Sequence, residues 1–343
     1  MSANVTDVDQ AGGIPDTETV PDANEALAQD GEFSFEELPD APPKQGFRMS
    51  PVGWVCSAIV VFWIAIVFLG PYIAPFDEAE YIEDVIEKYE EVDTIFMDPD
   101  TNAFFGTDSS GRDVFSRVLY GARTTIGISF TATILAYLIG ITLGIAAAVS
   151  GGWLDTIFSR LVDAILTFPN IMLGLVVIAG FSPYIGQITG SQFWDAIIIL
   201  ITLAGIVYAA SVFRIARALG QDIMVQDFVE AARARGEGTW YIIRKEVLPN
   251  AAMPLATDFG LRLVFVILFV TSLSFLGLGV QPPASEWGSM VRESLAGMRF
   301  GEGGNIWATI APAIAIASVT ISINLIVDDI SAQAGGSLAK KMV

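Results

Sequence analysis

The residues best suited to chemistry in this 343-residue sequence are carboxylates that lie in or beside apolar runs. Asp163 and Asp328 would form the paired carboxylates of an aspartyl intramembrane protease only if they faced each other deep among helices. The sequence contains no histidine, so it lacks the usual general base and the usual transition-metal ligand. Its single cysteine, Cys56, excludes an intrachain disulfide. We therefore expect neither a catalytic residue nor a metal site.

Two further kinds of chemistry have little support in the sequence. It contains no G-x-x-x-x-G-K-[ST] phosphate loop and no G-x-S-x-G nucleophile elbow, so we expect no ATP hydrolysis by this chain itself. An ion-coupled carrier tends to need ionisable groups near the middle of the membrane. The charged residues in or beside apolar runs all lie near predicted helix ends, where interfacial solvation is the simpler account. They are Asp163, Asp195, Asp258, Arg262, Asp328 and Asp329.

Composition is typical of a polytopic membrane protein. Hydrophobic residues make up 53% of the chain and charged residues 16%, and the mean hydropathy is +0.56. Six runs are long enough to cross a bilayer. They cover residues 52–74, 125–149, 161–182, 194–213, 257–279 and 306–327. Pro169 and Pro183 interrupt or bound the third and fourth runs, and we predict an all-α fold with six transmembrane helices.

The net charge of −20 arises in two segments. Residues 1–48 contribute −9 and residues 77–113 contribute −11, while the rest of the chain is balanced. The acidity therefore belongs to water-exposed segments, and it would suit a halophilic host. Residues 1–48 show no sustained period, so we predict a disordered tail. A cleavable signal peptide would instead begin with a short basic region.

Basic residues predict the orientation of the crossings. Six crossings place both termini on one side of the membrane, and twelve of the eighteen lysines and arginines fall on that side. We therefore predict a multi-pass protein of the cell membrane with both termini in the cytoplasm. Residues 77–100 are then extracellular, and the charged segment 227–250 faces the cytoplasm.

Segment 227–250 is charged and helix-prone although it lies between two apolar runs. The pattern from Asp222 to Arg235 predicts a helix with one apolar face. That face carries Val225, Phe228, Val229 and Ala232, while Gln226, Asp227, Glu230 and Arg233 lie largely on the other side. An apolar face at the cytoplasmic surface must rest on a partner or on lipid headgroups.

A glycine break follows this helix. Gly236 can leave the helical region without steric cost and so end it. Thr239 is the expected cap of a second short helix, which Pro249 closes before the next crossing starts. The apolar side of this second helix carries Trp240, Ile243 and Val247.

The spacing of Glu230-Ala231-Ala232, Gly236 and Leu248-Pro249 resembles the signature cytoplasmic loop of binding-protein-dependent ABC import permeases. Glu246 departs from that pattern, which favours isoleucine at this place. In that family the loop is a coupling helix that docks in a groove on the ATPase subunit. The resemblance therefore implies an ATPase-coupling role for Glu230, Ala231, Ala232, Gly236, Leu248 and Pro249.

Four other stretches resemble the second permease subunit of the dipeptide/oligopeptide/nickel branch of this family, in the family's order. They are FGTDSSGRDVFSRVLYGAR (105–123), SGGWLDTIFSRLVDAILTFPNIML (150–173), SLSFLGLGVQPPASEWGSM (272–290) and NLIVDDI (324–330). The resemblance implies the type I ABC importer permease fold, with six transmembrane helices and a cytoplasmic coupling helix. Residues 1–48 and 77–100 lie outside the match.

The resemblance also implies partners. They are a homologous second permease subunit, two ATP-binding cassette ATPase subunits that bind ATP and magnesium, an extracellular substrate-binding protein, and membrane lipid. We expect no cofactor in this chain and no nucleic acid partner. The chain would form half of the pathway for di- or oligopeptides or a related small solute. The alternatives are an ion-coupled secondary transporter and, third, a membrane-embedded hydrolase.

These inferences divide the chain into five parts. The expected parts are an acidic cytoplasmic tail (1–48), a first transmembrane helix (49–75), an extracellular acidic segment with a polar turn (76–124), a permease core of five transmembrane helices (125–330) with its coupling loop at 222–248, and a cytoplasmic C-terminal tail (331–343). The residues that contact the cargo are not specified by the sequence, because a pathway lined by Gly, Ala and Ser has no chemical fingerprint.

Overall fold

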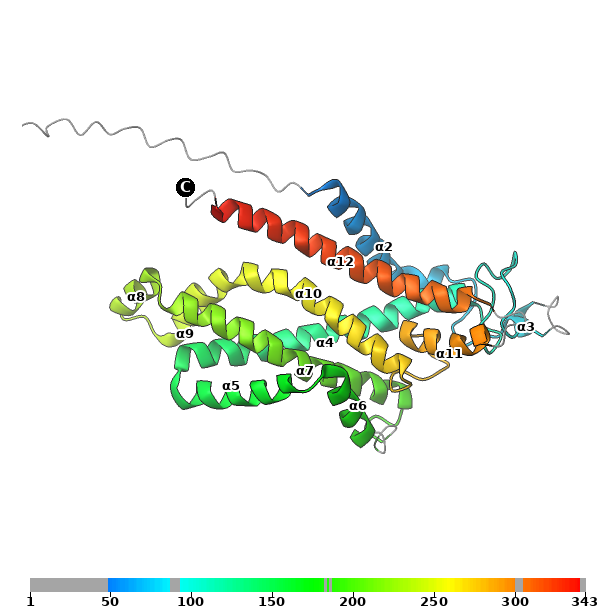
Figure 1. Ribbon diagram of the computed structural model, residues 1–343, viewed down its shortest axis with the longest axis horizontal. Helices are drawn as coiled ribbons and strands as arrows, with labels where there is room; N and C mark the ends of the chain where they lie inside the picture. The colour runs from blue at the N-terminus through cyan, green and yellow to red at the C-terminus, as the bar shows by residue number, and fades with distance from the viewer. Residues whose placement is uncertain (1–48, 87–92, 182–183, 185–186, 300–304, 340–343) are drawn as a thin grey trace, which may run out of the picture. The chain divides into compact units, whose positions relative to one another are not determined.

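The computed structural model describes residues 49–86, 93–181, 184, 187–299 and 305–339. Within these residues the chain is helical, and β pairing is limited to two isolated bridges, Tyr81 with Arg112 and Thr107 with Asp113. The tail that we predict to be disordered, residues 1–48, lies outside the described residues. Figure 1 shows the long helices packed lengthwise against one another.

Five helices in the described part of the chain are long and apolar enough to cross a bilayer. They are α2 (Pro51–Ile73), α4 (Val114–Ser150), α7 (Gln192–Met224), the continuous helix Thr239–Phe275 and α12 (Trp307–Ala339). A bent pair, α5 (Gly152–Thr167) with α6 (Asn170–Phe181), passes the same test and raises the number to six. The predicted all-α membrane fold is confirmed, with five apolar helices that can cross the membrane, or six where the bent pair is counted as one span.

Proline chemistry explains the bent pair. The axes of α5 and α6 meet at 93°, and the break falls at Phe168 and Pro169. Proline disfavours helical geometry in the residue before it, and Phe168 is extended at φ −85° and ψ 140°. The new helix then starts with a bond from the Leu173 amide to the Pro169 carbonyl (3.0 Å). The predicted third crossing, 161–182, is therefore two helices.

Two element boundaries differ from the predicted ones. Helix α4 begins at Val114, so residues 114–124, which we assign to the extracellular segment, are its first turns. Asp113 caps this helix and accepts a hydrogen bond from the Ser116 amide (2.7 Å). At the other end of the chain, α12 continues to Ala339, into the predicted C-terminal tail 331–343. Hydropathy alone marks the apolar centre of such helices and misses their polar first and last turns.

The helix that follows the glycine break does not stop at Pro249. Helix α9 (Thr239–Tyr241), the π-helical turn η3 (Ile242–Val247) and α10 (Leu248–Phe275) form one uninterrupted helical path. Pro249 stands in the first turn of α10, where a residue without a backbone N–H is tolerated. The expectation that Pro249 closes a separate short helix is therefore wrong, and the chain enters the membrane without a second turn.

Helices α4 and α7 run in the same direction and approach each other closely. Gly140 faces Val212, and Gly144 faces the Phe213 carbonyl and Ala216. Further along, the Ala148 side chain faces Gly220. The sequence stripe Gly140, Gly144 and Ala148 thus forms the close helix contact that small residues allow in membranes.

Helix α4 offers a direct test of this contact. A Cβ at Gly144 would stand 2.7 Å from the Phe213 carbonyl oxygen and 3.0 Å from the Arg217 backbone nitrogen, neither of which can move aside. We expect Gly144→Val to destabilise the folded chain by about 1–3 kcal/mol or more, the usual cost of overpacking. Thermal unfolding in mild detergent measures the effect.

Gly127 on the same helix is the matched control. A Cβ there meets nothing within 4 Å, so Gly127→Val carries the same change in helix propensity without the steric overlap. An equal loss of stability in the two variants would show that α4 does not depend on close contact at Gly144.

Candidate functional site

The turn after α7 is the first candidate site, and Figure 1 shows it at one end of the long helices. Helix α7 ends at Met224, and the separate helix α8 (Asp227–Ala234) follows. The break lies at Val225 and at Gln226, which is extended at φ −79° and ψ 147°. The predicted single helix from Asp222 to Arg235 is therefore wrong, because α7 continues into its first residues and ends before α8 begins.

Gly236 ends α8 as predicted. Its φ of +83° lies in the left-handed region that favours glycine. The Gly236 amide donates to the Arg233 carbonyl (2.9 Å), and the Glu237 amide donates to the Ala232 carbonyl (3.2 Å). These two bonds form a Schellman motif, which satisfies carbonyls that the helix end would otherwise leave open. The cap of the next helix is Gly238, and Thr239 makes no side-chain capping bond.

The apolar face of this turn is divided between the protein core and the solvent. Val229, Ala232 and Val247 are fully buried in one hydrophobic cluster with the end of α7 and the start of α10. In contrast, Val225 is 82% exposed and Trp240 is 71% exposed. The inner part of the predicted face thus anchors the turn, while its outer part remains uncovered.

The residues of the coupling signature divide in the same way. Ala232 is buried, Leu248 is half-buried, and Glu230, Ala231, Gly236 and Pro249 are exposed. Glu230 also borders an open hollow of about 560 Å³ beside the break after α7. The hollow is lined by Met224, Val225, Gln226, Glu230, Arg233 and Ala234. The turn therefore presents charged and apolar groups together, on a helix whose inner side is buried in the core.

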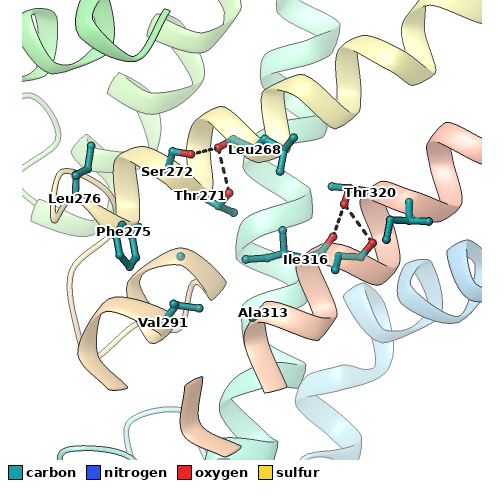
Figure 2. A pocket seen from close by; sticks show the side chains of 12 residues that line it. Leu268, Thr271, Ser272, Phe275, Leu276, Val291, Ala313, Ile316 and Thr320 are labelled. Carbon is teal, nitrogen blue, oxygen red and sulfur yellow. Dashed lines mark hydrogen bonds between the residues drawn. The ribbon is translucent and has the colours of Figure 1, made fainter. Parts of the chain in front are cut away.

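A second hollow lies between α10, α11 (Trp287–Arg299) and α12, and Figure 2 shows it from close by. Its volume is about 550 Å³. Three hydroxyl groups line it, but each donates to a carbonyl of its own helix: Thr271 to Ile267, Ser272 to Leu268, and Thr320 to Ile316. The surface of this groove is therefore almost entirely apolar.

Buried charges connect the acidic segment to the helices. Arg112 donates from Nε to Asp108 (3.0 Å), and Arg117 also donates to Asp108. Both arginines donate to Glu293 on α11, at 3.3 Å and 3.1 Å. Arg117 is 1% exposed and Asp108 is 1% exposed. This network ties the polar turn 106–113 to α4 and α11, which sequence spacing alone does not indicate.

The block that ends the fifth crossing is mainly structural. Gly277 follows the end of α10 with φ +85°, as the expected break of that helix requires. Glu286 is fully buried and accepts hydrogen bonds from the Ser289 amide (2.9 Å) and the Thr125 hydroxyl (3.2 Å). Burial raises the pKa of Glu286 above its usual value, against these bonds. Trp287 donates from its indole to the Val118 carbonyl (3.0 Å) and fixes α11 to α4.

A polar cluster also lies deep among the apolar helices. Asp258 on α10 accepts a hydrogen bond from the Tyr137 hydroxyl (2.6 Å) and pairs with Arg262 (3.2 Å). Tyr137 stands near the centre of the uncharged part of α4, which extends from residue 124 to residue 150. The expectation that Asp258 and Arg262 lie near a helix end is therefore wrong, because the helix that carries them begins at Thr239.

Catalytic and metal chemistry gain no support from the described residues. No group of three or more His, Cys, Asp or Glu side chains there could hold a metal ion. Asp163 and Asp328 lie on α5 and α12, two helices without substantial mutual packing in the described part of the chain. The paired carboxylates of an aspartyl protease are thus not assembled by this fold.

Fold and sites together define a multi-pass membrane protein with a partly exposed helical turn at one end. Residues 140–332 match the model of the family described as binding-protein-dependent transport system inner membrane component. The chain is 31% identical over 288 residues to the glutathione transport system permease protein GsiD of Pectobacterium atrosepticum, covering 82% of this chain and 86% of that one. It belongs to this family of transport permeases, and the ion-coupled carrier is not favoured.

Two further comparisons concern another relative and a solved structure. A peptide transport system permease protein of Brucella suis is 35% identical over 236 residues, which cover 68% of this chain and 73% of that one. Among solved structures, an inward-facing form of the MetNI methionine ABC transporter aligns with a TM-score of 0.47 and 21% identity, over 62% of this chain and 94% of that chain. The predicted permease of a binding-protein-dependent importer is confirmed by the family match.

The Asp108 network leads to a test. Arg117→Gln removes the cation from a buried cluster and leaves the carboxylates of Asp108 and Glu293 undercompensated. Breaking a buried ion pair in this way typically costs about 3–5 kcal/mol. We expect a marked loss of thermal stability and faster proteolysis within residues 76–113, measured on purified protein.

Arg123→Gln is the control for this experiment, since Arg123 lies on the same helix but is exposed. Equal stability of the Arg117 variant and the native chain would mean that the network does not hold the acidic segment in place.

Proposed function

We propose that this chain is one of two homologous permease subunits of an ATP-driven ABC importer, coupled to its ATPases through residues 222–248. The observation that carries the proposal is the α8 turn, which is rigid on its inner side and uncovered on its outer side. Because Val229 and Ala232 anchor α8 in the core, a movement of the ATPase subunits is passed on by α8 to the helices of the permease without deforming α8. The exposed Glu230, Val225 and Trp240 provide the charged and apolar contacts that a protein groove can cover.

The energy source belongs to the partners in this proposal. Two ATP-binding cassette subunits bind ATP and magnesium, and their closure moves the docked α8 turns. This chain has no catalytic role of its own. Because the acidic segment lies at the opposite end of α4 from the α8 turn, the two docking faces can lie on opposite sides of the membrane. We place both termini and α8 in the cytoplasm, and the acidic segment outside, where a substrate-binding protein delivers the cargo.

The second permease follows from the need for a closed path. Backbone groups of a peptide cannot cross hydrocarbon unsatisfied, so a protein-lined route is required. One six-crossing subunit supplies one wall of such a route. The open apolar groove between α10, α11 and α12 (Figure 2) is a surface that the second subunit can complete. The excess of acidic residues outside the membrane further suits a halophilic host.

The proposed cargo is a di- or oligopeptide, or a small solute related to peptides such as glutathione. This proposal rests on the glutathione and peptide permeases that the chain is similar to. Competition for uptake of a labelled tripeptide in cells that contain the complete transporter tests it. Unlabelled di- and oligopeptides should reduce uptake strongly, whereas sugars and metal chelates should not. Competition by sugars or chelates alone would contradict the assignment.

The coupling role is tested at Gly236. A valine there must adopt φ near +83°, a left-handed conformation that costs a β-branched residue of order 1–3 kcal/mol. A Cβ meets nothing within 4 Å, so strain in the turn is the only direct effect. We expect Gly236→Val to reduce ATP-driven uptake and recovery of tagged ATPase subunits in pull-downs, at unchanged permease levels in the membrane.

Gly238→Val provides the matched comparison two residues away. Gly238 has φ −74° and ψ 160°, which valine adopts readily, and a Cβ there also meets nothing within 4 Å. This variant should retain uptake and ATPase recovery. If both variants transport at the native rate, the turn is not the coupling element.

A further inference from the structure

Arg262 is a partly accessible cation deep in the membrane-spanning part of the chain. Its side chain is 19% exposed, and that of its partner Asp258 is 12% exposed. Asp258 is held by the Tyr137 hydroxyl at 2.6 Å, at the centre of the uncharged part of α4. A charged pair at this depth is costly against lipid, so such residues face other protein or a water-filled cavity.

The guanidinium of Arg262 has hydrogen-bond donors that no described protein group accepts from. Within the described residues, Nε donates to Asp258 (3.2 Å), and the two terminal nitrogens donate to no protein group. The Phe265 ring lies beneath the guanidinium carbon at 6.0 Å. Asp258 and Phe265 thus hold the cation in place while its terminal nitrogens remain open to a ligand with two acceptor oxygens.

The accessible face of α10 connects Arg262 to the groove of Figure 2. Phe265 is 47% exposed and Leu268 is 43% exposed, and Leu268 already lines the groove. Phe265 lies three residues from Arg262 and three residues from Leu268, so it is a neighbour of both on the helix surface. The exposed Phe265 ring therefore lies between the cation and the edge of the apolar groove.

We propose that Arg262, positioned by Asp258, binds the carboxylate of the cargo during its passage along the face of α10. The inference rests on the proposed function and adds the chemical class of the group recognised within the pathway: a free carboxylate, such as the C-terminus of a peptide. The guanidinium offers a paired hydrogen bond to the two carboxylate oxygens, and Asp258 keeps the site neutral when no cargo is bound.

Uptake of two cargoes that differ only in this group tests the proposal. Trialanine and its C-terminal amide are compared at concentrations below half-saturation, in cells that contain the complete transporter. In each variant the initial rate for trialanine is divided by the initial rate for its amide. This ratio is then divided by the same ratio in the native chain, which cancels any preference of the binding protein. For Arg262→Gln we expect this quotient to fall about tenfold, the change expected from losing one charge-assisted hydrogen bond.

Arg217→Gln is the control substitution. Arg217 also pairs with an aspartate, here Asp155 on another helix, and Asp155 engages both its Nε and its Nη2. Its loss should change both rates by the same factor. If Arg262→Gln also lowers both rates equally, Arg262 is structural and the inference is overturned, while the proposed function stands. If the native transporter takes up neither compound, the cargo proposal fails and this inference fails with it.

A thiol-labelling experiment covers the case in which Arg262→Gln does not fold. Phe265→Cys places a thiol beside Arg262 in the assembled transporter, with the native chain and its buried Cys56 as background. An anionic methanethiosulfonate should react faster than a cationic one, and added trialanine should slow the anionic reagent. Absence of labelling in both resting and ATP-driven transporter would show that this face meets lipid or the second subunit, which overturns the proposal.

Discussion

The close contact between α4 and α7 is the constraint on which the rest of the structure depends. Backbone groups in the membrane must be satisfied within each helix, so the helices associate through side-chain packing, close approach and hydrogen bonds between side chains. Gly140 and Gly144 let the backbone of α4 reach that of α7 at Phe213 and Ala216. Because both helices run in the same direction, this contact fixes their ends together as well as their centres.

Each end of this pair then supports a different surface. At the start of α4, Asp113 caps the helix and Arg117 ties the acidic segment to Glu293 on α11. At the end of α7, Val229 and Ala232 anchor α8 in the core that α7 and α10 share. Both surfaces depend on contacts with these long helices, since α8 is only eight residues long and the described part of residues 76–113 holds one helix of four residues and two isolated bridges.

Local sequence signals predicted the parts of this architecture that depend on local chemistry. Gly236 is left-handed as its place after a helix suggests, and the Gly140, Gly144 and Ala148 stripe lies at a helix contact. Apolar runs located the crossings, but they missed the polar first turns of α4. The prediction that Pro249 ends a helix is wrong because a proline in the first turn of a helix and a proline that ends a helix look alike in sequence.

The charged clusters could not be predicted from such local sequence signals. Arg117 and Glu293 are 176 residues apart, and Tyr137 and Asp258 are 121 residues apart. Neither residue of such a pair indicates its partner, since a buried ion pair has no sequence period. The prediction for Asp258 is wrong for a related reason. The depth of Asp258 follows from α9, η3 and α10 being one helix. The hydropathy of residues 239–256 is too low to reveal that continuity.

That continuity has a mechanical consequence for the proposed transport cycle. The helix from Thr239 to Phe275 begins at the turn that we propose as the ATPase contact, and it carries Arg262 about 35 Å further on, at a rise of 1.5 Å per residue. In that cycle a displacement of α8 would pass through the turn at Gly236 into this helix, which is continuous from Thr239 to Phe275. The Tyr137 hydroxyl bond to Asp258 is one of the contacts between this helix and α4, beside the packing of Phe259 on Phe130 and Tyr137. Motion at the ATPase would therefore change the surroundings of Arg262 directly, which joins the release of a bound carboxylate to the closure of the ATPases.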